Sequence, residues 1–306
     1  MDMKLLVAGG CSDGCEKGKQ DSCEVLLIQI IEKSASIAST VGPKLNLARR
    51  GAALHLMDDK LLLLGGSGIS DQLRSVELLP VDFNDKSIWC LIDSAISGGN
   101  SCFASVCRQN VVTIFGGWDG RSCLETAESF DVSTKKSNSL ANAPSPLKNA
   151  AAVQINESHS LLIGGWDGHR TLTTIFSYHH STDQFCMKAL LPFPLECHTA
   201  CRSGDLIFIS GGFDGETVVN KILVLDANSF EVTLLPVCLT EARENHVSVV
   251  SRDKLVVLGG WNGFQSLSSV EIFHVLPDFP YLESLVVSGR LAVARNKACL
   301  CLLPYD

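Results

Sequence analysis

The sequence has no run of about 18 consecutive apolar residues, the length that a membrane-spanning helix requires. It also has no excess of basic residues, because 25 Lys and Arg stand against 33 Asp and Glu and give a net charge of -8. Nucleic-acid-binding proteins usually carry a basic stripe. We therefore expect neither a membrane nor a nucleic acid as partner. Residues 1–10 are too acidic for a signal peptide and their apolar run is too short, so we expect them to form a strand.

Motifs of catalysis and cofactor binding are absent as well. The sequence contains no His-x-x-Glu-His or Cys-x-x-Cys motif. Two glycine-rich strings, at residues 65–68 and 98–99, lack the following helix that would bind a phosphate at its N-terminus. We therefore expect no enzymatic activity, no cofactor and no catalytic residue.

Cysteine, in contrast, is abundant, with 13 residues. Most lie within apolar stretches, as Cys299 and Cys301 do, and a free cysteine behaves as a small buried hydrophobic residue. A secreted chain with this odd number would risk mispairing, so we expect a reducing, cytoplasmic setting. Cys11, Cys15 and Cys23 share one loop and could bind zinc or sense oxidants. That loop has no paired histidine, and we predict no metal site.

One short phrase recurs along the whole chain: an apolar run that ends in Gly-Gly. The double glycines fall at 9/10, 65/66, 116/117, 164/165, 211/212 and 259/260, at intervals of 56, 51, 48, 47 and 48 residues. Repeats near 50 residues built from short strands are typical of β-propellers, and a double glycine at this period indicates the kelch type. The sequence therefore predicts an all-β, six-bladed propeller of four antiparallel strands per blade, with residues 1–306 forming a single domain.

The form of the phrase fits the middle strand of a propeller blade. Each run of about five apolar residues is continuous, as in Leu61–Leu64, and such a run indicates a strand buried on both faces. The glycines that follow allow a positive φ and the close approach of another backbone. A second predicted strand precedes every Gly-Gly strand except the first. We expect Ala298–Leu303 to supply that missing strand, beside Lys4–Ala8, and so to close the ring and leave no long open edge.

These residues resemble the kelch domain of the BTB–kelch adaptor proteins over the whole chain. Four phrases read Gly-Gly-aromatic-Asp/Asn-Gly, and Glu77, Glu128 and Glu271 stand two residues before a later apolar or aromatic position. A kelch blade usually has a tryptophan seven residues after that position, where this sequence has Ser137, Phe185, Val232 and Pro280. Only Trp89 could serve, so we expect eroded outermost strands. The sequence contains no BTB or BACK region.

The resemblance implies a binding site on one face of the propeller. The aromatic residues after the glycines are Trp118, Trp166, Phe213 and Trp261. In the family, residues at this position often touch bound peptide, although they could simply cover the end of the blade. Basic residues stand sixteen before a first glycine or near the equivalent position: Arg49, Lys148, Arg243 and Arg295.

Family arginines at these basic positions clamp acidic groups at the channel rim, and a planar guanidinium suits a carboxylate. Asn100 and Leu195 interrupt this ring and Glu196 opposes it. The alternative is that the arginines bond backbone carbonyls at the blade edge. Because two antiparallel neighbours bring both groups to the same end of a blade, we expect the aromatic and basic residues to ring one mouth of the channel and to bind an acidic peptide.

Two histidines occupy matching positions, thirteen residues before their glycines. His198 and His246 could face one another across the channel, or they could be satisfied within their strands, which is the interpretation we favour.

Three classes of function remain open. The resemblance implies a protein-interaction module that recruits a protein to a cullin-type ubiquitin ligase. An actin-binding kelch protein is the alternative. A propeller enzyme of the mutarotase or oxidase type fits less well, because the copper oxidase needs tyrosine ligands and the chain has three tyrosines.

Overall fold

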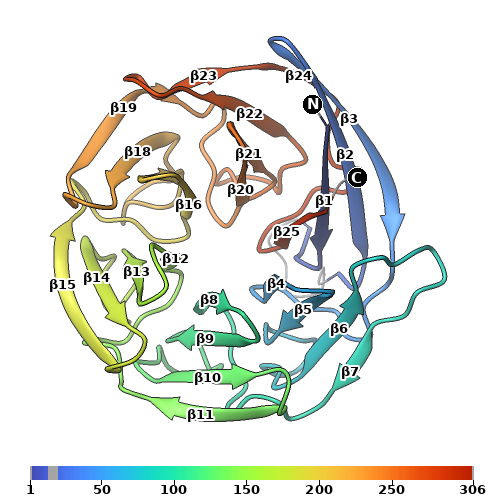
Figure 1. Cartoon of the computed structure of the whole chain (residues 1–306), viewed down its shortest axis with the longest axis vertical. Helices are drawn as coiled ribbons and strands as arrows, with labels where there is room; N and C mark the ends of the chain where they lie inside the picture. Colours follow the sequence, from blue (N-terminus) through green and yellow to red (C-terminus); the bar gives the residue numbers. More distant parts are fainter. Residues whose placement is uncertain (1, 13–19, 305–306) are drawn as a thin grey trace.

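The computed structural model describes residues 2–12 and 20–304 and shows six sheets arranged in a ring (Figure 1). One sheet has five strands and the other five have four each. We number the sheets as blades 1 to 6, with blade 1 containing both the first and the last strand. Within the described residues no helix occurs. The prediction of a six-bladed, all-β propeller is confirmed.

Each blade runs from an innermost to an outermost strand, and neighbouring strands are antiparallel. The innermost strands are β25 (Cys299–Leu303), β4 (Ala53–Met57), β8 (Ala104–Arg108), β12 (Ala151–Gln154), β16 (Thr199–Ser203) and β20 (Val247–Ser251). The second strands are β1 (Asp2–Ala8), β5 (Lys60–Leu64), β9 (Val111–Phe115), β13 (His159–Ile163), β17 (Leu206–Ser210) and β21 (Lys254–Leu258). These second strands carry the Gly-Gly phrases at their ends, as the sequence predicts.

The third strands are β2 (Cys23–Ile31), β6 (Val76–Pro80), β10 (Ala127–Asp131), β14 (Thr174–His179), β18 (Lys221–Asp226) and β22 (Val270–Val275). The outermost strands are β3 (Ser34–Gly42), β7 (Cys90–Ile92), β11 (Lys136–Leu140), β15 (Gln184–Leu190), β19 (Val232–Cys238) and β23 (Leu282–Ser284). The expected erosion is seen in blade 6, where β23 has three residues, but β11, β15 and β19 also lack the tryptophan and have five to seven. The strand β7, in the blade that has Trp89, is only three residues long. Trp89 is buried just before β7, and its indole N–H donates to the Pro43 carbonyl at 3.1 Å.

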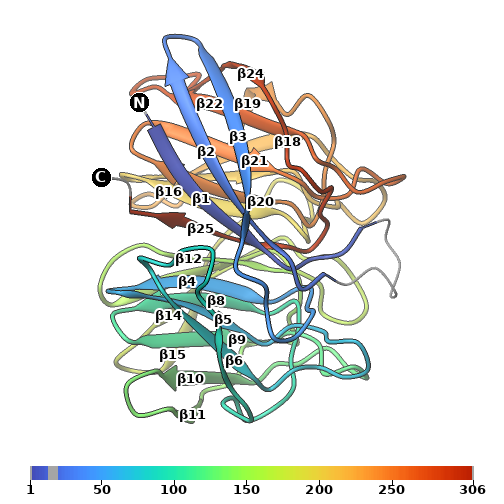
Figure 2. The same cartoon turned by 90° about the vertical axis from the view of Figure 1, so that its right-hand side faces the viewer.

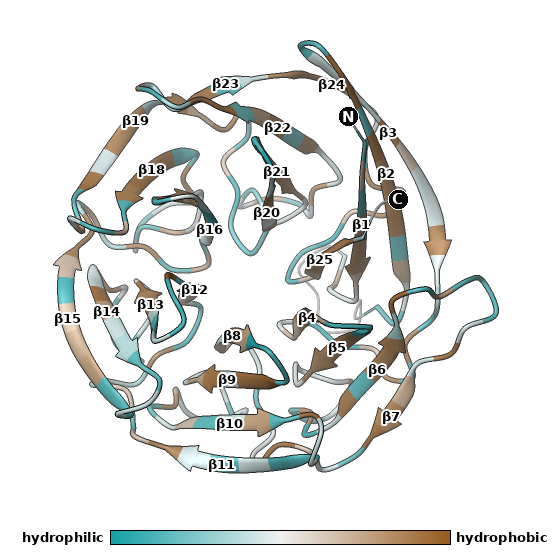
Figure 3. Ribbon diagram, viewed as in Figure 1, coloured by the Kyte–Doolittle hydropathy of each residue, from teal (hydrophilic) through white to brown (hydrophobic). Residues whose placement is uncertain are grey.

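The hydrophobic core lies between the blades. In β5, Leu61 and Leu63 pack toward blade 1, whereas Leu62 and Leu64 pack toward blade 3. Successive side chains of a strand point to opposite faces, so a strand that is covered on both sides must be apolar throughout. The second strands, such as β5 and β9, are accordingly brown in Figure 3, whereas β3 and β11 at the outer edge are paler. Each fully buried leucine contributes about 1.5–3 kcal/mol relative to an exposed one.

The double glycines permit contact with the backbone of the next blade. Gly116 has a φ of +60°, and a Cβ built on it would lie 2.0 Å from the Leu147 carbonyl oxygen. The N–H of Gly117 donates to that same oxygen at 2.7 Å. The first glycine therefore makes room for a carbonyl that the second one binds, and a side chain at either position would separate the blades.

The ring closes as predicted. Strand β25 pairs with β1 in a register that joins Lys4 to Leu303 and Ala8 to Cys299, and the two strands lie side by side in Figure 2. The sequence did not predict β24 (Val286–Ser288), a fifth strand that pairs in parallel with β3. It belongs to the connection from blade 6 to β25, which passes along the outer edge of blade 1.

The predicted innermost strands begin too early. The pattern predicts a strand from Cys102, whereas β8 begins at Ala104. Cys102 has a φ of +55°, a conformation that interrupts the strand and turns its backbone toward the neighbouring blade.

Candidate functional site

A closed ring of hydrogen bonds surrounds the central channel. Six equivalent residues have φ values between +52° and +61°: Gly51, Cys102, Asn149, Cys197, Asn245 and Lys297. The backbone N–H of each one donates to the carbonyl of the same position in the preceding blade, at 2.8–3.0 Å, and Gly51 donates to Lys297 to complete the circle. Sequence reasoning missed this ring, because the positive φ is carried by six residues of four types.

The ring residues and their C-terminal neighbours line a narrow channel of about 130 Å³. Lys297 extends into it, with Nζ 3.9 Å from the Cys102 sulfur. His198 and His246 line the same channel from blades 5 and 6, and burial lowers the pKa of His198 to about 4 and that of His246 well below its ordinary range. His246 Nε2 lies 3.0 Å from Thr199 Oγ1 and 3.2 Å from Ser210 Oγ, so it is held by blade 5 rather than by its own strand.

The four predicted aromatic residues lie at the ends of their Gly-Gly strands and are half-buried. Each forms an isolated antiparallel bridge with the residue that enters the innermost strand of its blade: Ser101 with Trp118, Lys148 with Trp166, Glu196 with Phe213 and Glu244 with Trp261. This pairing brings Lys148, but no other residue of the predicted basic group, to the same end of the blade as the aromatic residues. We call this end the mouth of the channel.

Lys148 connects two of these aromatic residues. Its Nζ lies 4.7 Å from the centre of the Trp118 ring and 4.3 Å from that of Trp166. A lysine over an aromatic face contributes about 0.5–1 kcal/mol at an exposed site. The result is a half-buried Trp–Lys–Trp cluster that spans blades 3 and 4 at the mouth.

The predicted ring of basic residues is wrong in its alignment. Ala151 pairs with Ile163, twelve residues later, whereas the equivalent Thr199 pairs with Ser210, eleven residues later. Blade 4 therefore has one extra residue in its β12–β13 turn, and Lys148 stands one position after the place that Arg49 occupies in blade 2. The residues that border the mouth at the Lys148 position are Arg50, Ser101, Lys148, Glu196, Glu244 and Asn296. The mouth thus combines two basic and two acidic positions.

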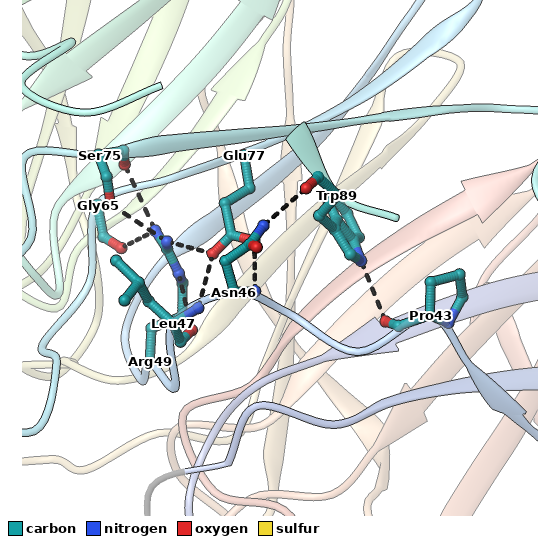
Figure 4. Close-up of polar contacts among 8 residues, drawn as sticks. All are labelled: Pro43, Asn46, Leu47, Arg49, Gly65, Ser75, Glu77 and Trp89. Carbon is teal, nitrogen blue, oxygen red and sulfur yellow. Dashed lines mark hydrogen bonds and ion pairs between the residues drawn. The ribbon is translucent and has the colours of Figure 1, made fainter. Parts of the chain in front are cut away.

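The prediction that Arg49, Arg243 and Arg295 line the mouth is also wrong. All three are among the largest fully buried side chains of the protein. Arg49 donates from Nη1 to the Gly65 carbonyl at 2.8 Å and from Nη2 to Glu77 Oε1 at 2.6 Å, and both side chains of this ion pair are 0% exposed (Figure 4). The alternative stated for these residues, bonding to carbonyls at the blade edge, is the observed one.

The buried arginine belongs to a repeated polar cluster inside the blade. In blade 2, Glu77 also accepts the backbone N–H of Asn46 at 2.8 Å (Figure 4). Blade 6 repeats this arrangement with Arg243, Glu271 and the Thr240 N–H, and blade 1 repeats it with Arg295, Glu24 and the Ala292 N–H. In blade 2 the cluster therefore joins a carboxylate, a guanidinium, a glycine carbonyl and the backbone N–H three residues before the arginine in one hydrogen-bond network. In blade 1 the arginine and the glutamate are 3.7 Å apart, an ion pair without a hydrogen bond.

Blades 4 and 5 replace the whole cluster by apolar residues. Leu147 and Leu195 stand at the position that Arg49 has in blade 2. The carbonyl of Arg49 accepts the N–H of Gly10 in the preceding blade, and the carbonyls of Leu147 and Leu195 accept those of Gly117 and Gly165 in the same way. The glutamate position holds Phe176 and Leu223. The residue three before each leucine is proline, Pro144 or Pro192, which has no N–H to satisfy. This correlated exchange was visible in the sequence and would have identified the arginines as structural.

Two of the three cysteines considered as a metal or redox site are described. Cys11 and Cys23 are buried, and burial raises the pKa of the Cys23 thiol far above its ordinary value, which disfavours the reactive thiolate. Cys15 lies outside the described residues. Over residues 2–12 and 20–304, no group of His, Cys, Asp and Glu side chains has an arrangement suited to a metal ion. In the same part of the chain, no helix is long and apolar enough to cross a membrane.

Comparisons with known proteins agree with this fold. The kelch motif family matches residues 99–144, within blade 3, and residues 242–276, within blade 6. Among curated proteins, no sequence matches the chain. Among solved structures, "Structure of YjhT" superposes with a TM-score of 0.68 at 14% identity and covers 82% of this chain and 86% of that one. At this identity the likeness shows the fold alone. The motif matches and the ring of six blades together support a kelch-repeat propeller.

Proposed function

We propose that the protein is a non-enzymatic interaction module that binds a protein or peptide at the mouth of its channel. The observation that carries this proposal is the cluster of Trp118, Lys148 and Trp166, with Phe213 and Trp261 on the following blades. Aromatic side chains supply a large contact area at low entropic cost and are enriched in interface hot spots. Burying the cluster further under a partner would desolvate Lys148 and strengthen its interaction with the rings.

The mouth suits a ligand that combines acidic and apolar side chains. Lys148 and Arg50 border it in blades 4 and 2, and either can pair with a carboxylate. Glu196 is satisfied by Asn149 Nδ2 at 2.7 Å and by Thr171 Oγ1 at 3.1 Å, so its charge is held in place on the blade 5 side. We therefore expect an acidic peptide to lie over blades 3 and 4 and to avoid the acidic side of blades 5 and 6.

The channel supports a binding role rather than a catalytic one. Its histidines are neutral at pH 7 because burial depresses their pKa values, and the backbone of its narrowest ring is used to join the blades. From the resemblance to BTB–kelch adaptors, we propose recruitment of a substrate to a cullin-type ubiquitin ligase in the cytoplasm. That role requires a BTB region, which this sequence does not contain.

Affinity capture from a cell lysate with quantitative mass spectrometry tests the proposal. The wild-type propeller is compared with the triple variant Trp118→Ala, Lys148→Ala and Trp166→Ala. The matched control is Lys188→Ala with Phe230→Ala, which removes a lysine over an aromatic ring, 5.5 Å apart, between the outermost strand of blade 4 and the turn before β19 in blade 5. We expect partners of the wild type to be lost from the triple variant and kept by the control. Partners kept by both variants would refute binding at the mouth and favour the blade edges, as in an actin-binding kelch protein.

A further inference from the structure

The blades also differ in a way that the proposed function does not use. Blade 3 has neither the complete polar cluster of blades 1, 2 and 6 nor the apolar replacement of blades 4 and 5. It keeps the glutamate, Glu128. It also keeps the backbone N–H three residues before the arginine position, which Ser97 donates to Glu128 Oε2 at 3.0 Å. The arginine position, however, holds Asn100, whose carbonyl accepts from Gly66 as that of Arg49 accepts from Gly10. Blade 3 therefore has the acceptors of the cluster without its cation.

A cleft of about 580 Å³ lies at this position. Residues of three segments line it: Asp71 and Gln72 from blade 2, Gly98 and Asn100 from the connection between the blades, and Asp119 and Glu128 from blade 3. Blade 2 has Leu47 where blade 3 has Gly98, so the loss of this side chain leaves the entrance open, whereas Gly99 is packed against the Gln72 backbone. A Cβ built on Gly98 would have no atom within 4 Å, which shows that the space above it is open.

The carboxylate of Glu128 is the acceptor that a ligand in the cleft can reach. Glu128 lines the cleft and accepts two hydrogen bonds from Ser97, at 3.0 and 2.6 Å, both on Oε2. Asn100 is 5% exposed, and its Nδ2 donates to the Gly116 carbonyl at 2.5 Å. Asn100 Oδ1 and Gln72 Oε1 have no hydrogen-bond partner among the described residues, but both atoms are buried behind the cleft surface.

The charges around the cleft favour a cation. Asp71, Asp119 and Glu128 line it, and Asp119 is kept ionised because the N–H groups of Ser122 and Arg121 hold its pKa below the ordinary value. Two arginines are near in the chain. Arg74 donates from Nε to the Ile96 carbonyl at 3.1 Å, and the side chain of Arg121 is exposed, and neither lines the cleft. Leu124 and Leu140 supply apolar walls that suit a methylene stem.

We propose that the cleft of blade 3 binds the guanidinium of an arginine side chain from a partner protein. The partner's arginine takes the place that the protein's own arginine fills in blades 1, 2 and 6. A guanidinium has five N–H donors and no acceptor, and in blade 2 Arg49 donates to the Gly65 carbonyl and to Glu77. In blade 3 the equivalent carbonyl, that of Gly116, already accepts from Asn100 Nδ2, so Glu128 is the acceptor left for the partner's guanidinium. Asp119 directly follows Trp118, so the cleft adjoins the mouth, and the proposal rests on the proposed function only in assigning the arginine to a protein partner.

The test measures binding of Nα-acetyl-arginine amide by chemical-shift perturbation, with the neutral isostere Nα-acetyl-citrulline amide as the control ligand. We expect arginine amide to shift the resonances of Glu128 and its neighbours and citrulline amide to bind about tenfold more weakly or not at all. The variant Asn100→Arg supplies the missing side chain and should abolish binding while keeping or raising the thermal unfolding temperature. The variant Glu128→Gln should weaken binding about tenfold or more.

Several outcomes would overturn the proposal. These are equal binding of arginine and citrulline amides, unchanged binding by Asn100→Arg, or tighter binding of free arginine than of the capped form, which would indicate a small-molecule site. Because the triple variant of the mouth leaves Asn100 and Glu128 in place, it should bind arginine amide normally. Failure of the mouth and failure of the cleft are therefore distinguishable.

Discussion

The buried ion pair of blade 2 offers a sharp test of how the blades are held together. Replacing Arg49 by leucine would leave Glu77, which is 0% exposed, without the cation that lies at 2.6 Å in the native protein. Removing one partner of a buried ion pair costs about 3–5 kcal/mol, because the other charge stays buried without compensation. We expect Arg49→Leu to lower the free energy of unfolding by about this amount.

The protein itself indicates which further changes should restore stability. Blade 5 has Leu195, Leu223 and Pro192 at the three positions that Arg49, Glu77 and Asn46 occupy in blade 2. Adding Glu77→Leu removes the carboxylate but leaves three of its donors without this partner: the N–H groups of Asn46 and Leu47, at 2.8 and 3.2 Å, and Asn46 Nδ2, at 3.0 Å. Adding Asn46→Pro then removes the two donors of Asn46. Each step should recover part of the loss, by about 1–3 kcal/mol for each buried polar group removed.

Urea-induced unfolding of the wild type and the three variants, followed by tryptophan fluorescence and by circular dichroism, measures these differences. The expected order of stability is wild type first, then the triple variant, the double variant and the single variant. The reasoning would be refuted if Arg49→Leu cost less than about 1 kcal/mol, the range of an exposed pair. It would equally be refuted if the triple variant were no more stable than the single one.

Three other predictions concern pH, glycine and ring closure. Because the pKa of buried His198 is about 4 and that of His246 is also depressed, unfolded histidines bind protons that the folded ones do not, so stability should be full above about pH 6.5 and fall toward pH 4. The free energy of unfolding should fall by about 1.4 kcal/mol per pH unit for each histidine. In the variant His198→Gln this free energy should change less steeply with pH, and a slope equal to that of the wild type would contradict a depressed pKa of His198. Gly117→Val should cost several kcal/mol, since its φ is +109° and a Cβ would lie 1.9 Å from Asn100 Oδ1 of the same blade; calorimetry that shows unchanged stability would count against this close packing at the end of the strand. Deleting residues 297–306 removes β25 and the last member of the hydrogen-bond ring, so the whole domain should lose cooperative unfolding, and an unchanged melting temperature would disprove closure by this strand.

The fold could be predicted from the sequence because its strongest constraints are local and repeated. Every Gly-Gly phrase needs a buried strand before it and a close backbone after it, and Gly116 and Gly117 show both. Ring closure followed from the missing partner of the first strand, and β25 supplies it. The strand β24 could not be foreseen, because three residues pairing at an outer edge leave no periodic pattern.

The site was predictable only in part. The positions of the aromatic residues follow from the end of a strand, which the glycines mark. The direction of an arginine side chain does not follow from its position, and Arg49, Arg243 and Arg295 turn into their blades toward Glu77, Glu271 and Glu24. The glutamates were noticed as a motif, but their role as counterions appears only when the three blades with Arg and Glu are compared with the two that have leucine. A fixed offset also failed in blade 4, where one extra turn residue moves Lys148 to the mouth.

Site-specific photo-crosslinking tests the central claim, that a protein partner binds at the mouth, most directly. A benzophenone amino acid is placed at Phe213, at the mouth, and in a matched protein at Glu157, which is exposed in the β12–β13 turn at the opposite end. Both proteins are irradiated in the same lysate. We predict discrete adducts from position 213 that are absent from position 157 and are lost when Trp118, Lys148 and Trp166 are replaced by alanine. Adducts from position 157 alone, or adducts from position 213 that survive the triple replacement, would contradict binding at the mouth.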